Sequence, residues 1–213
     1  MNYDKTAREV FEEWGRDYHA EGMETAHWPR VRKIFDLIEP SNGNYLEVGV
    51  GTGYGLVHMA THQYANGFCF GLDLSTSMVE HTRKRTAGLA NVAVEAGDFL
   101  TWDFGDMRFD TIFSMEVFYY FHDINAGLER ARSLLRPAGT LWVAVNFYEE
   151  NEDSADWPEQ LGTRMQRWSA RDYFKAFERA KFLNVEQRMI EAPVSDGSDR
   201  STAPTLLTCG TKP

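Results

Sequence analysis

The sequence predicts a three-layer α/β sandwich, in which a seven-stranded, mostly parallel sheet is covered by helices on both faces. Three observations lead to this fold class. From residue 41 onward, short apolar runs alternate with segments of helical pattern, and strands that alternate with helices form parallel sheets. The last two apolar runs have no helix between them, so we expect a hairpin in which the last strand is antiparallel. The first 40 residues precede this alternation and are expected to form a helical lid.

Each expected strand is a short apolar run, and several expected helices begin at a capping residue or end at a glycine. The strands are Asn44–Val48, Gly67–Leu74, Val92–Ala96, Phe109–Met115, Thr140–Asn146, Val185–Ile190 and Thr205–Cys209. The helices of the sheet layers are Tyr54–Tyr64, the segment between the cap Ser75 and Gly88, Ala126–Leu135 before Pro137 and Gly139, and Ser169–Ala180. Two more helical stretches, Thr6–Tyr18 and Pro29–Leu37, belong to the lid.

The chain has 213 residues, which is the size of one elaborated domain. Within it we expect residues 1–40 to form the lid, 41–146 the ligand-binding core, 147–168 an insertion beside the site, and 169–213 a C-terminal helix and hairpin. The formal net charge is -10, from 32 acidic and 22 basic residues. Because nucleic-acid binders neutralise phosphates with a basic face, this balance argues against a nucleic-acid partner.

The remaining composition predicts a cytoplasmic protein without a metal site. Cys69 and Cys209 each lie inside an apolar run, which indicates two buried strand thiols and not a disulfide framework. His58 and His62 are four residues apart on one helix, but the glutamate of the zinc motif is absent between them. The first residues are polar and acidic, unlike a signal peptide. No apolar run approaches the roughly 18 residues that a membrane span needs.

The segment Leu46–Gly55, LEVGVGTGYG, carries the functional information. It places four alternating glycines between a strand and a helix, where glycine lets the backbone turn sharply and approach a ligand. No register of these glycines fits the G-x-G-x-x-G/A pattern of nicotinamide cofactors, and the Gly-Lys-Ser/Thr of phosphate loops is absent. Glu47 precedes the first glycine by two residues; its charge would repel a pyrophosphate and attract a ligand with an ammonium group.

This segment resembles motif I of the class I methyltransferases that use S-adenosylmethionine, which have a Rossmann-like fold. The pattern E/D-x-G-x-G-x-G stands here as Glu47 to Gly53. Four further stretches resemble family motifs in the right order: GLDLS, AGDFL, FDTIFSMEVFYYF and LLRPAGTLWVAVNF, the last with Ala138 where glycine is common. The resemblance covers residues 41–146, and five motifs at proper spacing make it specific.

The resemblance implies roles for individual residues in holding the donor. Asp73 matches the acidic residue that binds both ribose hydroxyls, although a helix cap is the structural alternative. Asp98 matches the residue that contacts the adenine amino group, with a turn as its alternative, and Phe99 would flank the ring. Thr52 either bonds the donor or fills the turn. The full set expected to bind S-adenosylmethionine, and its product S-adenosylhomocysteine, is Glu47, Gly49, Gly51, Thr52, Gly53, Asp73, Leu74, Asp98, Phe99 and Met115.

Methyl transfer is an in-line displacement from a sulfonium, so positioning does much of the work and a general base is needed only by some acceptors. The carboxyl ends of the fourth and fifth strands supply the candidate residues Glu116, Tyr119, Tyr120, His122, Asn146, Tyr148 and Glu149. We assign Glu116 and His122 as candidate catalytic residues. The expected substrate contacts are Tyr18, Trp28, Tyr119, Asn146 and Tyr148.

Two segments are expected to shape the acceptor site. The stretch Phe11–Trp28 combines aromatic and acidic residues and reads as a lid, or as an amphipathic covering helix with Phe11, Trp14 and Tyr18 on one face. Asn146–Trp168 is long, acidic and aromatic, as binding loops often are. We expect a small-molecule acceptor, and the acidic and aromatic residues favour a cationic amine. We expect no membrane or nucleic-acid partner. The protein is expected to be a monomer or a homodimer. The alternatives are a protein or RNA acceptor, and a non-catalytic donor-binding module.

Overall fold

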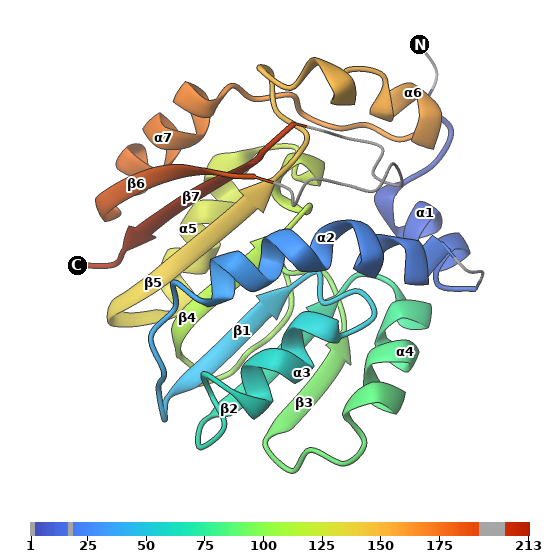
Figure 1. Cartoon of the computed structure of the whole chain (residues 1–213). Coiled ribbons are helices and arrows are strands. Elements are labelled where there is room, and N and C mark those ends of the chain that lie inside the picture. Colours follow the sequence, from blue (N-terminus) through green and yellow to red (C-terminus); the bar gives the residue numbers. More distant parts are fainter. Residues whose placement is uncertain (1–2, 17–18, 192–202) are drawn as a thin grey trace.

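A computed structural model describes residues 3–16, 19–191 and 203–213 of the chain. Seven strands form one sheet in the order β3-β2-β1-β4-β5-β7-β6 (Figure 1). The first five strands in this order are mutually parallel, and β7 runs antiparallel to both of its neighbours, β5 and β6. The expected three-layer fold is therefore confirmed. The strands are β1 Asn44–Val48, β2 Phe68–Asp73, β3 Val92–Ala96, β4 Phe109–Met115, β5 Leu135–Val145, β6 Leu183–Ile190 and β7 Thr205–Thr211.

Helices cover both faces of the sheet (Figure 1). On one face α2 and α3 pack against each other, and α3 and α4 pack against β2. On the other face α5 and α7 pack against β5 and β7 respectively, and against each other. The helices are α1 Ala7–Trp14, α2 His19–Phe35, α3 Tyr54–Thr61, α4 Thr76–Thr86, α5 Ile124–Leu134, α6 Trp157–Leu161 and α7 Ala170–Arg179, with short 3-10 turns η1 Phe118–Tyr120 and η2 Glu152–Ser154.

The hydrophobic core has two halves because side chains of a strand alternate between its faces. In β1, Tyr45 packs into the half that lies under α2 and α3, whereas Leu46 and Val48 pack into the half under α5 and α7. Glu47 shares the parity of Tyr45, so its side chain lies on the α3 face. This register places a carboxylate beneath the beginning of α3.

Several elements differ in their bounds from the sequence-based expectation, and two of the differences change how the chain packs. The helix expected from Pro29 begins at His19, so Pro29 lies inside α2. Proline is favoured at the first turn of a helix, but here Trp28 packs edge-on against Tyr54 of α3, and this tertiary contact extends the helix upstream. The strand expected from Thr140 begins at Leu135 and passes through Pro137 and Gly139 with a register shift. The break expected at these residues is therefore an irregularity within β5.

The N-terminal helix α1 is fixed to α4 by a cap that α1 itself contributes. The Glu12 carboxylate accepts hydrogen bonds from the backbone N–H groups of Thr76 (2.5 Å) and Ser77 (3.3 Å), which are orphan donors at the beginning of α4. A Cβ at Gly15 would lie 2.6 Å from the Ser77 Cβ, so glycine permits this close approach. Close to α1, the Lys5 N–H also donates to the Gly162 carbonyl at 3.1 Å, which joins the N-terminal segment to the residues after α6.

Within residues 3–16, 19–191 and 203–213, no helix is both long enough and apolar enough to cross a lipid bilayer.

Replacing Glu12 by alanine is expected to destabilise the protein by about 1 kcal/mol, because two N-terminal N–H groups of α4 lose their acceptor. Urea unfolding followed by circular dichroism measures this change. Glu13→Ala is the matched control, since Glu13 is exposed and pairs only with the exposed Lys5 among the contacts described. Equal stability losses in the two variants would show that Glu12 does not cap α4.

Candidate active site

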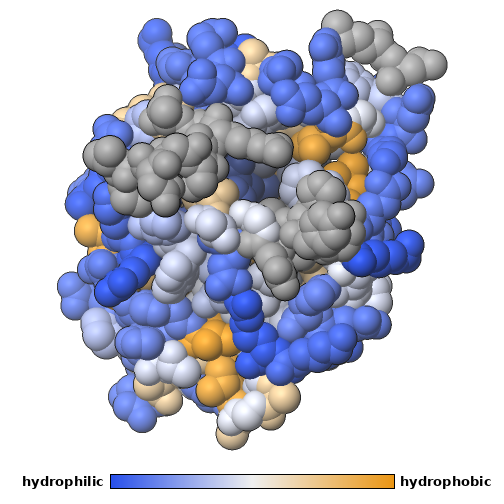
Figure 2. All heavy atoms as spheres, turned by 45° about the vertical axis from the view of Figure 1, so that its right-hand side comes forward, coloured by the Kyte–Doolittle hydropathy of each residue, from blue (hydrophilic) through white to orange (hydrophobic). Residues whose placement is uncertain are grey.

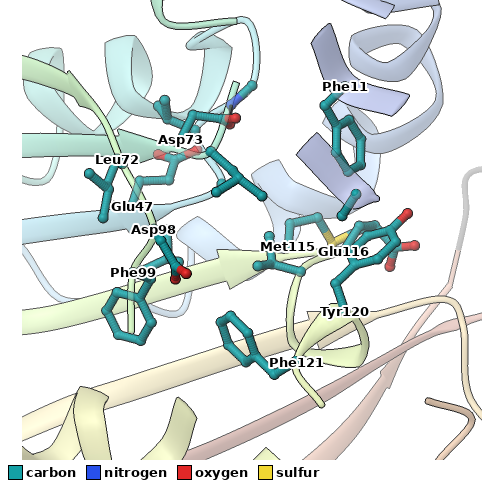
Figure 3. Close-up of a pocket in the computed structure, with 18 of the residues that line it drawn as sticks. Phe11, Glu47, Leu72, Asp73, Asp98, Phe99, Met115, Glu116, Tyr120 and Phe121 are labelled. Carbon is teal, nitrogen blue, oxygen red and sulfur yellow. Dashed lines mark hydrogen bonds between the residues drawn. The ribbon is translucent and has the colours of Figure 1, made fainter. Parts of the chain in front are cut away.

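A cavity of about 270 Å³ lies at the carboxyl ends of the parallel strands. The space-filling view of this side of the molecule shows a mostly hydrophilic face with a hollow near its centre (Figure 2). The close-up shows side chains from both ends of the cavity wall, with Glu47, Asp73 and Asp98 at one end and Glu116 and Tyr120 at the other (Figure 3). In open α/β sheets, ligands bind at this edge.

The glycine loop between β1 and α3 forms one wall of the cavity. Gly49, Gly51 and Gly53 have φ angles of 75°, 55° and 81°, in the left-handed region. At Gly51 an added Cβ would meet nothing within 4 Å, so this glycine is needed for its backbone conformation and not for packing. Gly49 and Gly51 line the cavity. Gly53 is the N-cap of α3 and lies against Thr82, outside the lining.

Glu47 is a buried carboxylate in the cavity wall, with 5% of its surface exposed. The Tyr45 hydroxyl donates to it at 3.1 Å. Gly55 makes room for it, because a Cβ there would lie 2.5 Å from Oε1. Burial raises the pKa of Glu47 to about 8; the Tyr45 hydrogen bond opposes this rise and the charge of Asp73 adds to it. A cationic ligand group next to Glu47 would restore its ionised form.

Asp73 ends β2 and connects the glycine loop to α4. Its two oxygens accept hydrogen bonds from the backbone N–H groups of Gly51 (2.8 Å) and Ser75 (2.9 Å). Burial raises its pKa to about 6, against the lowering effect of these hydrogen bonds. The cap of α4 is Ser75, whose hydroxyl accepts from the Met78 N–H at 3.2 Å. Asp73 is therefore not the helix cap, and it lines the cavity together with Leu74.

The Thr52 hydroxyl is buried, and it has no hydrogen-bond partner among the described residues. Thr52 lines the cavity. A buried hydroxyl that makes no hydrogen bond costs about 1–3 kcal/mol. A ligand in the cavity could supply the missing partner of this hydroxyl. Without such a ligand, Thr52 only fills the turn.

Asp98 and Phe99 follow β3 and form the end of the cavity beside Asp73. Asp98 is exposed, and its Oδ1 accepts from the Leu100 N–H at 2.9 Å, which is a turn interaction. The Phe99 ring is stacked with that of Phe121, with centroids 6.1 Å apart and planes inclined by 23°. Both rings line the cavity and together make an apolar floor for a flat group.

Glu116 lies at the opposite end of the cavity, and its backbone is strained. Its φ angle is 59°, which is rare for a residue with a side chain and is associated with functional sites. The carboxylate is buried and accepts from the Asn146 N–H and, at 2.9 Å, from the Tyr119 hydroxyl. Burial raises the pKa of Glu116 to about 7, against the lowering effects of these hydrogen bonds and of the Arg30 charge.

The other residues expected in the site have varied positions. Met115 lines the cavity, and so does His122, which is exposed. Tyr119, Asn146 and Tyr148 are buried outside the lining: the Asn146 side chain accepts from the Thr205 hydroxyl at 2.5 Å, and the Tyr148 hydroxyl donates to the Pro204 carbonyl at 3.0 Å. Trp28 and Glu149 also lie outside the lining described. Tyr18 falls outside the described residues.

Several lining residues were not expected as ligand contacts. Phe11 of α1 reaches the cavity and meets Tyr120 edge-on, with ring centroids 5.5 Å apart. Phe11 was expected on one face of a covering helix and not as a ligand contact. The others are Ala7, His27, Val48, Val50, Tyr54, Leu72, Gly97, Leu100, Val117 and Phe121. For His27 and Tyr54 no sequence signal exists, because their position depends on how α2 and α3 pack.

Comparison with known proteins identifies the family. The model of a methyltransferase domain family matches residues 46–139. A solved chain from the complex between the Haloferax volcanii Trm112 methyltransferase activator and a protein described as a methyltransferase is 33% identical, with a TM-score of 0.87 over 95% of this chain and 97% of that one. The chain belongs to the class I methyltransferases. The expected family is thus confirmed.

Two further relatives show how far the likeness of this methyltransferase extends. Nocamycin O-methyltransferase from Saccharothrix syringae is 33% identical over 135 residues, which are 62% of this chain. The match covers 48% of that enzyme, so the chain spans about half the length of this curated relative. A structure of phosphoethanolamine N-methyltransferase 2 from Haemonchus contortus in complex with S-adenosyl-L-methionine shares the fold at 15% identity, with a TM-score of 0.74 over 95% of this chain and 60% of that one.

The buried carboxylates of Glu47, Asp73 and Glu116 make the stability of the ligand-free protein depend on pH. Each has a folded-state pKa above its unfolded value, so folding favours the protonated form; this stability is complete below about pH 4 and is lost as pH rises toward 8. We expect the unfolding free energy of Glu47→Gln to fall less than that of the wild type between pH 5.5 and 8.5, by about 1 kcal/mol or more.

Urea denaturation at fixed ionic strength across this pH range measures the difference. Glu95→Gln is the control, because Glu95 is half-exposed and pairs with Arg83 on the surface. Taking the difference between variant and wild type removes the opposite contribution of His58, whose pKa burial lowers. A pH slope in Glu47→Gln equal to that of the wild type would mean that Glu47 is ionised in the free protein.

Proposed function

We propose that this methyltransferase transfers a methyl group from S-adenosylmethionine to a small-molecule acceptor by in-line displacement. One observation carries the proposal: Glu47, Asp73 and Asp98, from three successive strand ends, line a single cavity together with the left-handed glycine loop. This arrangement offers a carboxylate to a cation, a second carboxylate to hydroxyl groups, and a polar residue beside aromatic rings.

The residues present fit the donor. Glu47 is buried beneath α3 and would pair with the ammonium group of the methionine part. Asp73 retains lone pairs on both oxygens and would accept from the ribose hydroxyls, as strand-end carboxylates do in nucleotide sites. Asp98, with Phe99 and Phe121, would hold the adenine. The unpartnered Thr52 hydroxyl would gain a partner in the bound ligand. The crystallised Haemonchus relative, which holds S-adenosylmethionine, supports this assignment at the level of the fold.

When bound, the donor supplies an electrophilic methyl group on a sulfonium, which is an excellent leaving group. The chain's own task is then to hold the acceptor in line and to exclude water. Phe11 and Tyr120 cover the cavity near Glu116 and supply aromatic faces for a cationic or amine acceptor. Glu116 would accept a proton there, and the exposed His122 is a second candidate at the cavity wall.

The acidic chain favours a small molecule over RNA as the acceptor, because its net charge of -10 opposes phosphate binding. The Haloferax volcanii relative is crystallised with an activator protein, and its similarity spans nearly the whole of both chains. We therefore propose a Trm112-type activator as a protein partner of this chain. Co-expression with the Haloferax volcanii Trm112 protein and size-exclusion chromatography tests this; elution of the two chains apart at high and low salt would reject the partner.

Thr52→Val should have opposite effects on stability and binding. Valine replaces an unpartnered buried hydroxyl with a methyl group of similar volume, so the free protein should be as stable as the wild type or more stable. S-adenosylhomocysteine should bind roughly 10-fold more weakly, the equivalent of one lost hydrogen bond at about 1.4 kcal/mol. Thermal unfolding and calorimetric titration with S-adenosylhomocysteine measure the two quantities.

Thr82→Val is the matched control for this test. The Thr82 hydroxyl is buried and donates to the Gly51 carbonyl at 2.7 Å, so its loss should lower stability. Wild-type affinity in Thr52→Val would remove Thr52 from the donor site.

Formation of S-adenosylhomocysteine with a panel of amines, phenols, thiols and carboxylates tests the function itself. We expect turnover with amines first, since acidic and aromatic residues surround the acceptor end of the cavity. Turnover of only the carboxylates would contradict the amine preference. Tight binding of S-adenosylmethionine without turnover of any member, with or without the activator, would favour a non-catalytic donor-binding module.

A further inference from the structure

The insertion between β5 and α7 contacts the site without lining it. Residues 147–168 include η2 and α6, and all of them belong to the described part of the chain. None of these described residues lines the cavity. The sequence indicated that this stretch shapes the acceptor site, and the structure shows another route for such an effect. Hydrogen bonds from the insertion reach the two residues that donate to Glu116.

Both oxygens of the Glu116 carboxylate are held by a donor from the chain. Oε1 accepts from the Asn146 N–H, and Oε2 accepts from the Tyr119 hydroxyl at 2.9 Å. The Glu116 N–H donates to the Ala144 carbonyl at 3.0 Å, which fixes the left-handed backbone from the side of β5. An ionised carboxylate oxygen can accept more than one hydrogen bond. Glu116 is thus aimed before a ligand binds, and it retains the capacity to accept a proton at the cavity wall.

Each of the two donors is held in turn by the insertion. The Asn151 side-chain amide donates to the Asn146 carbonyl at 2.7 Å, and the Gln166 N–H donates to the Tyr119 carbonyl at 2.7 Å. The Tyr119 ring packs edge-on against Phe147, with centroids 5.3 Å apart. Asn151 is 2% exposed and is itself fixed as the N-cap of η2. The insertion therefore supports both hydrogen bonds that orient Glu116.

We propose that the insertion positions Glu116 as the base that takes a proton directly from the methyl acceptor. Glu116 is the catalytic residue, since it lines the cavity. Tyr119 and Asn151 are positioning residues, which act through the carboxylate and through the backbone of Asn146 respectively. The inference rests on the proposed methyl transfer, and it narrows the acceptor to a neutral nucleophile that carries a proton on nitrogen, oxygen or sulfur.

The proton and electron balance of the step closes within the site. The lone pair of the acceptor atom forms the bond to the methyl carbon while the carbon–sulfur bond breaks and its electrons remain on sulfur. The acceptor proton passes to the Glu116 carboxylate, so one positive and one negative charge disappear together. The carboxylic acid returns this proton to the solvent when the products leave. No further reactant is required.

The surroundings of Glu116 suit a base that works near neutral pH. Burial raises its pKa to about 7, and the hydrogen bonds from Asn146 and Tyr119 and the charge of Arg30 oppose this rise. Loss of either hydrogen bond is therefore expected to raise the pKa further. The titratable or charged groups that act on Glu116 or feel its charge are Arg30 of α2, Tyr54 of α3, Tyr119 and Tyr120 of η1, and Tyr173 of α7.

The competing explanation is that Tyr119 and Asn151 only satisfy buried polar groups and leave the base unaffected. Infrared titration of the complex with S-adenosylhomocysteine observes Glu116 directly. The carboxylic acid band that Glu116→Gln removes should titrate near pH 7 in the wild type. In Tyr119→Phe its midpoint should rise by about one pH unit, because the ionised carboxylate loses a donor. An unmoved midpoint would overturn the positioning role of Tyr119.

Tyr173→Phe is the matched control for the infrared titration. Tyr173 is a fully buried tyrosine whose pKa is raised by burial and by the charge of Glu116. Its hydroxyl has no hydrogen-bond partner among the described residues, and it does not line the cavity. The midpoint in this variant should stay close to that of the wild type. A shift equal to that of Tyr119→Phe would assign both changes to general packing.

Kinetics with a matched pair of acceptors tests the base. Aniline is neutral near pH 7 and carries protons on its nitrogen, whereas the nitrogen of N,N-dimethylaniline carries none. With aniline, kcat should rise with pH to a plateau, and Glu116→Gln should lower that plateau by on the order of 100-fold. Tyr119→Phe should move the midpoint of the rise upward by about one pH unit. With N,N-dimethylaniline, both variants should stay within about 3-fold of the wild type, because no proton has to be removed.

Asn151→Ala tests the part played by the insertion. The variant removes the donor to the Asn146 carbonyl, so the N–H that fixes Oε1 is held less firmly. With aniline, kcat should fall roughly 10-fold while KM changes less than about 3-fold, because the insertion does not contact the acceptor.

Ser154→Ala is the matched control within the insertion. Ser154 is buried in the same turn, η2, and its hydroxyl donates to the Asn151 carbonyl at 2.8 Å. It should leave kcat within about 2-fold of the wild type, because the amide of Asn151 keeps its bond to Asn146. Equal losses of kcat in Asn151→Ala and Ser154→Ala would reject the specific role of Asn151.

The remaining outcomes separate the inference from the function on which it rests. A raised KM with unchanged kcat in Asn151→Ala would make the insertion a binding loop and overturn its positioning role. Equal losses with aniline and N,N-dimethylaniline in Glu116→Gln would show that Glu116 is not the base. Absence of turnover of every acceptor in the wild type, with the infrared shift present, would count against the proposed function and retain the action of Tyr119 on Glu116.

Discussion

The cost of burying charge is the constraint on which this site depends. Glu47, Asp73 and Glu116 are all desolvated around one cavity, and burial raises the pKa of each above its ordinary value. Buried carboxylates that are not paired with a cation are expensive, so a fold retains them where a ligand or a reaction uses them. The two ends of the cavity meet this cost differently.

At the end of the cavity formed by Glu47 and Asp73, which we propose binds the methyl donor, backbone N–H groups and a small residue accommodate the charge. Asp73 takes the Gly51 and Ser75 N–H groups, and the second of these bonds leads directly into α4. Among the described residues, Glu47 accepts a side-chain hydrogen bond only from the Tyr45 hydroxyl, and Gly55 leaves room for its carboxylate. Of the three, Glu47 would gain most from a cation, and the ammonium group of the proposed donor would supply it.

At the other end of the cavity, which we propose binds the acceptor, the buried carboxylate of Glu116 is held by a strained backbone. Glu116 occupies a left-handed conformation that costs of order 1–3 kcal/mol when the residue is not glycine. The surrounding hydrogen bonds from Asn146 and Tyr119 hold that conformation. A residue that only ended a strand would not require this geometry, since glycine at this position would satisfy the turn without strain.

The sequence predicted the framework more fully than the acceptor end. β3 and β4 have the bounds that their apolar runs indicated, because polar or glycine residues flank both. Glu47 and Asp73 lie in the cavity wall as the motif implied, since a loop after a parallel strand has few alternative positions. The contact of Trp28 with Tyr54, which keeps Pro29 within α2, and the reach of Phe11 into the cavity depend on packing between distant segments, which no local pattern contains.

Asn146 and Tyr148 illustrate the same limit at the end of β5. Both follow the strand at the expected edge, but their side chains hydrogen-bond to Thr205 and Pro204 at the beginning of β7 and just before it. The antiparallel neighbour of β5, which is β7, thus occupies the polar groups of Asn146 and Tyr148, so they do not face the cavity. Sequence position gives the edge of the sheet on which a residue lies, whereas the neighbouring strand decides whether its side chain is available.

Helix α1 is linked to the Asp73 end of the cavity through charge as well as contact. Glu12 accepts a hydrogen bond from the N–H of Thr76, which is three residues after Asp73 in the chain. The charge of Glu12 contributes to the raised pKa of Asp73. The same short helix carries Phe11 over the cavity to Tyr120. A cationic ligand in the cavity would offset the repulsion between Glu12 and Asp73, and would therefore stabilise the packing of α1 on α4 together with its own binding. Because α1 also carries Phe11 to Tyr120, a ligand bound near Asp73 would strengthen the cover over the Glu116 end of the cavity.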